Sequence, residues 1–549
     1  MIAKPTQRVY SQSLEKIEFV FPVALFIVFL AITLPGISWG APSVWHPDEV
    51  VVRSMKALDG EWKFDEINFD YPSLPQYAMF GLGKIILGMG YTDTEVLVAA
   101  RVLSALLAGL TIVLTYFITR RITNNVYIAG LSGVLLLCVS EMTHNGRFAH
   151  NDTYITFFVT LAVFFLIKYR LSSQRGWLYA SFIAIGMAAS SKYNGISLVI
   201  VPILMYLYTE RQSFLKQPLR TFETLFIGGA LTFLGYAVGT PKSFFWMSYY
   251  FKRMIPALIH TGNYARQPDS VRGVLGQYGS FANGVGLPLF ILFAAAFLWA
   301  GYQVFQAYGL KKEERDSRAD VLVILLLSIL ALDLPIMISY NYPVRFFLSM
   351  MPIFAVLGAL FVGDLYRKLR ATENPAYLQF LRLGLAAIIL FSFARNISIM
   401  LMFLNDARLP ASEFIKTLPA GTSLEHTLYP PRIPLEHFDR EHNYPIFFKK
   451  SIDDVAPTHR NYVYNAGEAG LDDRQTDYLV ADSFTIDRMK DPYICQSMQT
   501  ECDFFKQLGT GGSDHYKLIA EFSYSVPPYL PKLRISFVNP AIRIYERIK

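Results

Sequence analysis

The chain contains the uncharged run FVFPVALFIVFLAITLPGI at residues 19–37. A helix of about 20 consecutive apolar residues is long enough to cross the hydrocarbon core of a bilayer. The run follows a short polar start that carries Lys4, Arg8 and Lys16. It is long for the apolar part of a signal peptide, and no small-residue cleavage site clearly follows it. We therefore interpret it as a retained first membrane span.

Similar apolar runs recur as far as residue 402. They lie near residues 97–118, 126–142, 153–168, 178–191, 195–209, 222–240, 281–305, 320–339, 346–363 and 378–402. Together with the first run they predict roughly eleven transmembrane helices. Residues 74–90 are also apolar, but this run is shorter and contains Lys84. We expect an interfacial helix there.

The composition excludes other classes of protein. Of the 549 residues, 53% are hydrophobic and only 17% are charged, which excludes a disordered chain. Three cysteines are too few for a small disulfide-rich scaffold. The net charge of +7 is explained by Lys and Arg on the inner face of a membrane protein and does not indicate nucleic-acid binding. The expected fold class is a polytopic α-helical membrane protein.

The distribution of basic residues predicts the orientation. With the N-terminus inside, every inner connection carries at least two Lys or Arg, and the short outer loops near 143–152, 189–195 and 340–345 carry one each. Basic residues concentrate on the cytoplasmic side of membrane proteins. We therefore expect a multi-pass protein of the cytoplasmic (inner) membrane, with long outer loops at 38–75 and 241–280. An odd number of spans places the C-terminus outside.

A second domain is expected after the last span, where the sequence becomes polar. Short segments typical of strands lie near 421–426, 477–482, 517–523 and 540–547, and a short helix is expected at 410–418. We predict a membrane catalytic module over 1–404 and an extracytoplasmic α/β domain over 405–549. Cys495 and Cys502 lie close together in this domain. An outer location allows a disulfide bond between them, and two free thiols are the alternative.

Several acidic residues are predicted to share the outer face. Asp48 and Glu49 directly follow the first span, Asp70 lies further along the same loop, and Asp152 lies in the second outer loop. Adjacent side chains point in different directions, so we expect only one of the first two acids to face a substrate. The alternative role of Asp48 and Asp152 is to cap the helices that follow them.

Cations are predicted on the same face at the ends of spans. They are Arg147, Lys192 and Arg345. A carboxylate can accept a proton and a fixed cation can hold a phosphate. Their predicted location on one face therefore favours a shared catalytic site over separate structural roles. The alternative for Lys192 and Arg345 is to extend toward lipid headgroups. His144, His150 and Asp152 are candidate metal ligands, and the sequence leaves open whether a divalent metal ion takes part.

The ordered set of motifs resembles the polytopic GT-C glycosyltransferases. The branch is that of the protein O-mannosyltransferases and lipid A aminoarabinose transferases, of the family 39/83 type. The motifs are HPDE at 46–49, Asp70-Tyr71-Pro72, Arg101, RFAHNDTYITFF at 147–158, SKYNG at 191–195 and YPVRFFLSMMPIFA at 342–355. The resemblance covers roughly residues 15–405.

This resemblance implies a polyprenyl-phosphate-linked monosaccharide as donor, used on the outer face and transferred with inversion to a hydroxyl of a protein, lipid or glycan. By the same analogy Asp48 is the candidate base and Asp152 its partner. Glu49 completes the candidate catalytic residues. The candidates for holding the donor phosphate are Lys192, Arg345 and Arg147. The candidates for other substrate contacts are Asp70, Tyr71, Tyr193, His260 and Tyr342.

Two departures from the family pattern narrow the prediction. The aminoarabinose branch carries Lys-Pro where this chain has Tyr71-Pro72, which argues against that sugar. Eukaryotic members carry a large β-trefoil insert, for which the connection at 241–280 is too short, so a prokaryotic enzyme is expected. The rival functions are a transporter or lipid flippase and a non-catalytic subunit of the same fold. Transporters place ionisable groups near the midplane, whereas most candidates here lie at the outer ends of spans.

Overall fold

The computed structural model describes residues 6–60, 71–263, 266, 269–309, 317–434, 436–438, 476–496, 499–511 and 513–548. The chain divides into two compact units. The larger unit consists of Met1–Ile37 and Asp48–Ile399, and the smaller unit consists of Ser38–Pro47 and Met400–Lys549. The ten residues Ser38–Pro47 therefore belong to the same unit as the C-terminal part of the chain.

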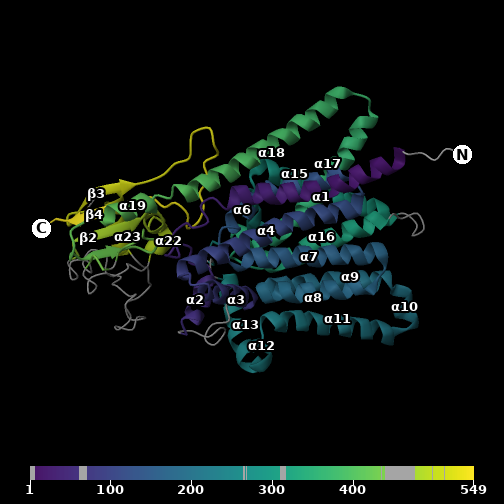
Figure 1. The fold of residues 1–549 in the computed structure, drawn as a ribbon, viewed down its shortest axis with the longest axis horizontal. Helices are drawn as coiled ribbons and strands as arrows, with labels where there is room; N and C mark the ends of the chain where they lie inside the picture. The colour runs from purple at the N-terminus through teal and green to yellow at the C-terminus, as the bar shows by residue number, and fades with distance from the viewer. Residues whose placement is uncertain are drawn as a thin grey trace. The chain divides into compact units, whose positions relative to one another are not determined.

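The larger unit is built from helices (Figure 1). They are α1 (Thr6–Thr33), α2 (Val51–Leu58), α3 (Leu74–Gly88), α4 (Asp93–Thr123), α5 (Val126–Leu137), α6 (Ser140–Asn145), α7 (Asn151–Ser172), α8 (Arg175–Ser191), η1 (Tyr193–Val199), α9 (Ile200–Thr209), α10 (Arg211–Lys216), α11 (Pro218–Gly239), α12 (Lys242–Phe245), α13 (Met247–Asn263), α14 (Gly273–Val285), α15 (Leu287–Gly309), α16 (Ser317–Met337), η3 (Val344–Met350), α17 (Met351–Ala371) and α18 (Pro375–Leu404). The label η marks 3-10 helices, and the last residues of α18 belong to the smaller unit.

Seven helices in the described part of the chain are long and apolar enough to cross a membrane. They lie within Asp93–Thr123, Asn151–Ser172, Pro218–Gly239, Leu287–Gly309, Arg318–Met337, Val344–Ala371 and Pro375–Ile415. Shorter apolar helices cover Glu18–Thr33, Val126–Leu137 and Tyr193–Thr209. Every apolar run expected to be a span coincides with helical structure, and the expected interfacial run at 74–90 coincides with α3.

Two of the expected runs are interrupted. The run at 281–305 contains the end of α14 and the start of α15, which meet at Gly286 with a φ of +87°. Glycine adopts this conformation at little cost, whereas residues with a Cβ are disfavoured there. The run at 126–142 likewise contains the end of α5 and the start of α6. Apolar composition continues through both breaks, so hydropathy alone could not locate them.

Helices α7, α8 and α11 run side by side (Figure 1). The backbones of α8 and α11 approach so closely that a Cβ on Gly186 would come within 2.1 Å of the Thr232 carbonyl oxygen. A Cβ on Gly235 would come within 2.4 Å of the Ile183 carbonyl oxygen. Small residues at helix interfaces permit this close packing. It fixes the C-terminal end of α8, where the next residue is Lys192.

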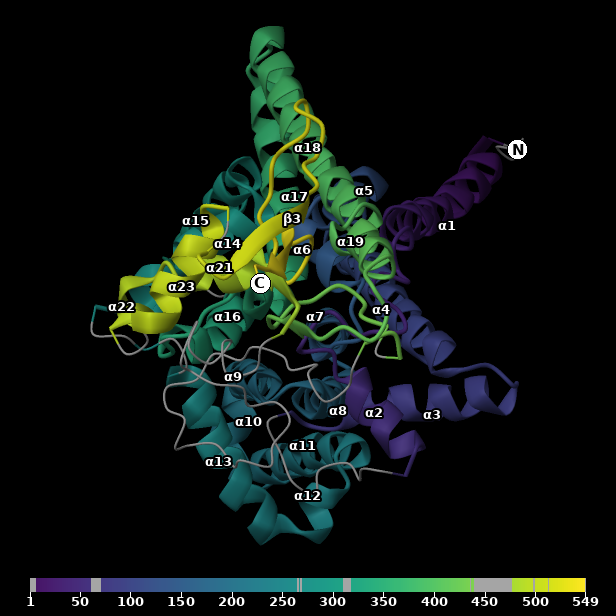
Figure 2. The same cartoon turned by 90° about the vertical axis from the view of Figure 1, so that its left-hand side faces the viewer.

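The smaller unit contains a four-stranded mixed sheet with the order β1-β2-β4-β3. Strand β1 runs parallel to β2, and the other neighbours are antiparallel. Its strands and helices are β1 (Leu424–His426), β2 (Tyr478–Asp482), β3 (Tyr516–Phe522), β4 (Ile542–Arg547), α19 (Arg408–Ile415), α21 (Ser483–Arg488), α22 (Pro492–Cys495) and α23 (Gln499–Gly509). The strands and the short helix expected from the sequence are confirmed. Figure 2 shows α21, α22 and α23 grouped together.

The sheet of the smaller unit is covered on both faces. Leu479 and Ala481 of β2 pack with residues of α21 and α23, whereas Tyr478 and Val480 pack with residues of α19. Successive side chains of a strand point to opposite faces, so β2 contributes to two cores. Cys495 and Cys502 form a disulfide bond, which decides between the two alternatives left by the sequence.

Candidate functional site

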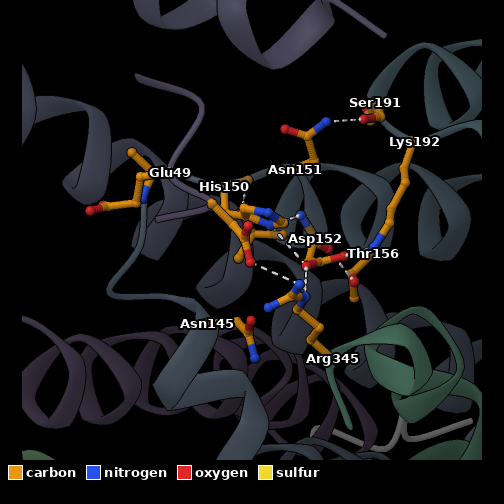
Figure 3. A network of polar contacts seen from close by, with 12 residues as sticks. Glu49, Asn145, His150, Asn151, Asp152, Thr156, Ser191, Lys192 and Arg345 are labelled. Atoms are coloured by element: carbon orange, nitrogen blue, oxygen red, sulfur yellow. Dashed lines mark hydrogen bonds and ion pairs between the residues drawn. The ribbon is translucent and has the colours of Figure 1, made fainter. Parts of the chain in front are cut away.

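Four charged side chains of the larger unit form one cluster, which we call the charged cluster. Asp48 precedes α2, Asp152 lies in the first turn of α7, Lys192 follows α8, and Arg345 lies in η3. Figure 3 labels Asp152, Lys192 and Arg345. The structure brings together two of the four acids and two of the three cations that the sequence placed on one face.

Charges alternate through the charged cluster. Arg345 Nη2 lies 2.8 Å from Asp48 Oδ2, and Lys192 Nζ donates to Asp152 Oδ1 at 2.6 Å. Arg345 Nε also lies 4.0 Å from Asp152 Oδ2. The Asp152 side chain is only 2% exposed, whereas those of Asp48 and Arg345 are 29% and 24% exposed. One acid is therefore enclosed by cations, and the other is accessible to a substrate.

Asp152 has a third basic neighbour in His150. The imidazole Nδ1 lies 2.8 Å from Asp152 Oδ2 and 3.4 Å from the Asp152 backbone nitrogen. One nitrogen cannot donate to the carboxylate and accept from the amide at the same time. The shorter contact favours a proton on Nδ1 that is donated to the carboxylate. His150 then fixes the orientation of Asp152 beside Lys192.

The backbone next to Lys192 is held by Asn151, whose Nδ2 donates to the Ser191 carbonyl oxygen at 2.7 Å. The Lys192 ammonium lies 4.2 Å from the centre of the Phe346 ring. Burial lowers the pKa of Lys192, and the negative charge of Asp152 opposes that shift. Lys192 is thus a desolvated cation that depends on nearby negative charge.

Glu49 has different partners from Asp48. Arg101 of α4 donates to Glu49 Oε1 through Nε at 2.8 Å and to Oε2 through Nη2 at 2.7 Å, and both side chains are fully buried. The Ala149 backbone N–H also donates to Glu49 Oε1 at 2.9 Å. These contacts join the first loop to α4 and to the second loop. The catalytic role expected for Glu49 stays a prediction, and its observed contacts are those of a positioning group.

The alternative that the acids are helix caps can be compared with the helix starts. Val50 is the N-cap of α2 and its side chain makes no capping hydrogen bond, so Asp48 is not the N-cap residue of this helix. His150 is the N-cap of α7, and Asp152 lies inside the first turn. A carboxylate there is also stabilised by the helix dipole. The Asp152 carboxylate is therefore stabilised both by its position at the start of α7 and by its contacts with basic side chains.

Tyr71 lies beside the charged cluster. Its ring centre is 5.9 Å from that of His150 in an edge-to-face arrangement, and the Arg53 guanidinium carbon is 5.7 Å from its ring centre. Burial, followed by the negative charge of Asp48, raises the pKa of Tyr71 to about 12. The phenol therefore keeps its proton at neutral pH and can donate a hydrogen bond to a substrate oxygen.

The remaining candidate residues have separate surroundings. Arg147 is buried and donates to the backbone carbonyl oxygens of Ile32, Pro35 and Thr143. Its expected contact with the donor phosphate stays a prediction. His260 is exposed on α13, and Asp70 lies outside the described residues.

Two of the expected substrate tyrosines make contacts through their hydroxyls. The Tyr193 hydroxyl accepts a hydrogen bond from Tyr250 at 2.9 Å. The Tyr342 hydroxyl donates to the Val271 carbonyl oxygen at 3.4 Å. The expectation that they contact substrate stays a prediction for both.

The two histidines of the second loop contact different acids. His150 contacts Asp152, whereas His144 contacts Glu141 at 3.3 Å. Within the described ranges no group of three or more His, Cys, Asp or Glu side chains is arranged to hold a metal ion. The charged cluster consists of two carboxylates and two cations, and the cations are poor neighbours for a metal.

The sequence did not reveal His150 as a partner of Asp152 or Phe346 as a partner of Lys192. The pair His150 and Asp152 lies at the start of a helix with a spacing of two residues, and that spacing could have suggested the contact. The contact of Lys192 with Phe346 joins α8 to η3, and only the packing of the helices reveals it.

Residues 73–221 match the family model described as dolichyl-phosphate-mannose-protein mannosyltransferase, or PMT. Over these residues the chain is similar to that family. The matching segment contains Asp152 and Lys192, whereas Asp48 and Arg345 lie outside it. Two of the four residues of the charged cluster therefore lie in the segment that matches the family model. The other two join the cluster by the geometry of this chain.

Curated relatives match part of the chain. An undecaprenyl phosphate-alpha-4-amino-4-deoxy-L-arabinose arabinosyl transferase 1 of Pseudomonas fluorescens (strain Pf0-1) is 29% identical over 196 residues. The match covers 34% of this chain and 32% of that relative, so it spans about a third of each. The activity of the whole relative therefore does not transfer to this chain by similarity alone.

Solved structures extend the similarity of fold to nearly the whole chain. The archaeal oligosaccharyltransferase AglB from Archaeoglobus fulgidus has a TM-score of 0.53 at 11% identity and covers 97% of this chain and 88% of its own. ArnT from Cupriavidus metallidurans bound to undecaprenyl phosphate has a TM-score of 0.50 at 14% identity and covers 96% and 97%. The chain is thus a multi-pass membrane protein with the GT-C fold.

Proposed function

We propose that the protein is an inverting glycosyltransferase. It moves a monosaccharide from a polyprenyl-phosphate donor to an acceptor hydroxyl on the outer face of the cytoplasmic membrane. The observation that carries this proposal is the charged cluster, in which an accessible carboxylate and two cations meet in the larger unit. One base and a cationic clamp are the smallest set of groups that the reaction requires.

Lys192 and Arg345 hold the phosphate of the donor. Polyprenyl phosphate leaves as an anion, so its departure needs positive charge and no general acid. Fixed cations in a site that excludes water can supply several kcal/mol to such a leaving group. In the structure each cation contacts a carboxylate. The incoming phosphate therefore shares or replaces these contacts, and the partly exposed pair of Arg345 and Asp48 exchanges more readily than the enclosed pair of Lys192 and Asp152.

Asp48 is the general base. Once the phosphate takes part of the charge of Arg345, the carboxylate of Asp48 is available to the acceptor. It removes the proton of the acceptor hydroxyl as that oxygen bonds to the anomeric carbon of the sugar. The bond between this carbon and the phosphate oxygen breaks, and its electron pair leaves with the phosphate. A carboxylate in this role contributes about 10²–10⁴-fold to the rate.

Asp152 keeps the cations in place. Its side chain is enclosed by Lys192, His150 and Arg345, and it is too buried to meet a bulky acceptor. Lys192 is itself desolvated, and its charge is stabilised by this carboxylate. We therefore assign Asp152 to orienting the clamp.

Several features support an outer location for the site and the smaller unit. The basic residues favour an N-terminus inside and roughly eleven spans. The disulfide bond between Cys495 and Cys502 favours an oxidising compartment for the smaller unit. Labelling of a Tyr529→Cys variant with a membrane-impermeant reagent in intact cells tests this orientation, because Tyr529 is exposed. Labelling only after permeabilisation would contradict it.

The donor class is supported by two relatives. The Pseudomonas fluorescens relative is named for an undecaprenyl-phosphate-linked sugar, and the ArnT structure contains undecaprenyl phosphate. For this chain we propose a polyprenyl-phosphate monosaccharide as donor and a hydroxyl of a protein, lipid or glycan as acceptor.

The decisive test is incubation of the purified protein with an undecaprenyl-phosphate-linked sugar and an envelope extract as acceptor. We expect release of undecaprenyl phosphate and appearance of the sugar on an acceptor, identified by mass spectrometry. Vesicle-reconstituted protein that moves the intact donor across the membrane without cleaving it would instead identify a flippase. Donor binding without cleavage in the presence of the extract would favour a non-catalytic subunit.

A further inference from the structure

Lys192 lies at the point where α8 ends and η1 begins, and its backbone is extended there, with a φ of −155° and a ψ of 132°. We propose that Tyr250 of α13 positions Lys192 through the hydroxyl of Tyr193, the next residue in the chain. The inference rests on the proposed function of Lys192 in holding the donor phosphate. It assigns to α13 a role in donor binding, as an element that positions a cation without touching the phosphate.

Three tyrosine hydroxyls form a chain of hydrogen bonds that ends at Tyr193. Tyr250 donates to the Tyr193 hydroxyl at 2.9 Å, and the hydroxyls of Tyr236 and Tyr250 are also in contact. A tyrosine hydroxyl carries one proton, so Tyr250 donates to Tyr193 and accepts from Tyr236. The ring centre of Tyr250 lies 6.3 Å from that of Tyr193 and 6.4 Å from that of Tyr236. The chain of hydroxyls therefore joins α11, α13 and η1.

Tyr250 is the point at which α13 enters the packed interior of the larger unit. It is 1% exposed, and it alone is buried among the residues of α13, all of which the structure describes. Its neighbours Tyr249 and Phe251 are 39% and 46% exposed. A buried hydroxyl that loses its hydrogen-bond partner costs free energy, so the phenol of Tyr250 is held in this position. Its contact with Tyr193 is thus a fixed link between α13 and the residue after Lys192.

The connection from α11 to α13 makes a second contact near Lys192. The Ser190 hydroxyl lies 2.8 Å from the hydroxyl of Thr240, which directly follows α11. Both side chains are fully buried. The connection therefore contacts the chain on both sides of Lys192, two residues before it and one residue after it.

The backbone transmits these contacts to Lys192. The Lys192 N–H donates to the Ala188 carbonyl oxygen at 2.9 Å, and the Gly195 N–H donates to the Lys192 carbonyl oxygen at 2.9 Å. A Cβ on Gly195 would lie 2.6 Å from the Ala188 carbonyl carbon, so η1 packs directly against the end of α8. A shift of Tyr193 therefore also moves Lys192. A misplacement of about 1 Å in a group that holds the substrate can cost about 10²-fold in rate.

The test is a double-mutant cycle between Tyr250→Phe and Lys192→Ala in the full-length protein, with binding of undecaprenyl phosphate as the readout. Tyr250→Phe keeps the buried ring and removes the hydroxyl that contacts Tyr236 and Tyr193. We expect it to weaken binding by about three- to tenfold when Lys192 is present, as for the loss of one hydrogen bond. In the Lys192→Ala background the loss should be less than about twofold, because the effect acts through Lys192.

Tyr249→Phe is the matched control, because it makes the same substitution at the adjacent, partly exposed residue of α13. It should leave binding of undecaprenyl phosphate within about twofold of the wild type. The inference is overturned if Tyr250→Phe binds as tightly as the wild type. It is also overturned if Tyr250→Phe loses as much affinity in the Lys192→Ala background, or if Tyr249→Phe loses as much as Tyr250→Phe.

Hydrogen–deuterium exchange tests the link without the donor. The Gly195 amide, which donates to the Lys192 carbonyl oxygen, should exchange faster in Tyr250→Phe than in the wild type and at the wild-type rate in Tyr249→Phe. Unchanged exchange in Tyr250→Phe would contradict the inference. If Lys192→Ala binds undecaprenyl phosphate as tightly as the wild type, the proposed role of Lys192 fails, and the exchange measurement still decides whether Tyr250 holds this turn.

Discussion

Two adjacent acids form two ion pairs of different character. Glu49 and Arg101 are fully buried and make two direct contacts, with a further hydrogen bond from the Ala149 backbone. Asp48 and Arg345 are 29% and 24% exposed, and Arg345 also faces Asp152. The first pair has no room to exchange partners, whereas the second can share its cation with an incoming anion. The two adjacent acids thus differ in both their partners and their exposure.

The largest expected effect tests the buried pair. Glu49→Ala leaves Arg101 buried without its carboxylate, which costs about 3–5 kcal/mol. Asp48→Ala removes a partly exposed partner of Arg345, which still has Asp152 nearby, so we expect a smaller cost than for Glu49→Ala. We therefore expect the unfolding temperature of Glu49→Ala to fall well below those of the wild type and Asp48→Ala, as measured by differential scanning fluorimetry. Equal destabilisation by both substitutions would remove the distinction between the two pairs.

The next effect concerns the clamp. A hydrogen bond to a charged group contributes about 1.5–3 kcal/mol, so the double variant Lys192→Ala and Arg345→Ala should bind undecaprenyl phosphate about 10²-fold or more weakly. Binding can be measured by quenching of intrinsic fluorescence in detergent. Arg382→Ala is a matched control, because Arg382 is a cation on α18 outside the charged cluster. Wild-type affinity in the double variant would contradict the clamp and favour the alternative that both cations contact lipid headgroups.

A smaller effect follows from the desolvation of Lys192. Burial lowers its pKa below the ordinary value of 10.5, so the ammonium loses its proton at a lower pH than a free lysine would. Affinity for undecaprenyl phosphate should therefore start to fall at a lower pH than the titration of an ordinary lysine would give. Lys192→Arg keeps its charge over this range and should show a weaker dependence. The same pH dependence in both proteins would show that another group is responsible.

The helices could be predicted from the sequence, because apolar runs are local patterns, whereas the side of the membrane on which the candidate residues lie stays a prediction. Apolar runs identify helices, and the parity of the loops places Asp48, Asp152, Lys192 and Arg345 on one face. Direct contact among these four side chains required the packing of helices. Hydropathy could not supply it.

The sequence could not reveal the partners that distinguish Asp48 from Glu49. Arg101 lies 52 residues after Glu49, and its position depends on how α4 packs. Nor could the sequence show that Ser38–Pro47 belongs to a unit formed mainly by residues after Met400, because Trp39 and Asp406 are 367 positions apart. Contacts of this range arise from tertiary packing and leave no periodic signal.

The central claim is that Asp48 acts as the base after the donor phosphate has taken charge from Arg345. The most direct test measures turnover and binding of undecaprenyl phosphate in Asp48→Asn, which is nearly isosteric but cannot accept the proton. We predict a loss in kcat of about 10²-fold or more, with binding as tight as in the wild type or tighter, because Asp48 no longer competes for Arg345. Near wild-type turnover in Asp48→Asn, together with its loss in Glu49→Gln or Asp152→Asn, would contradict the account.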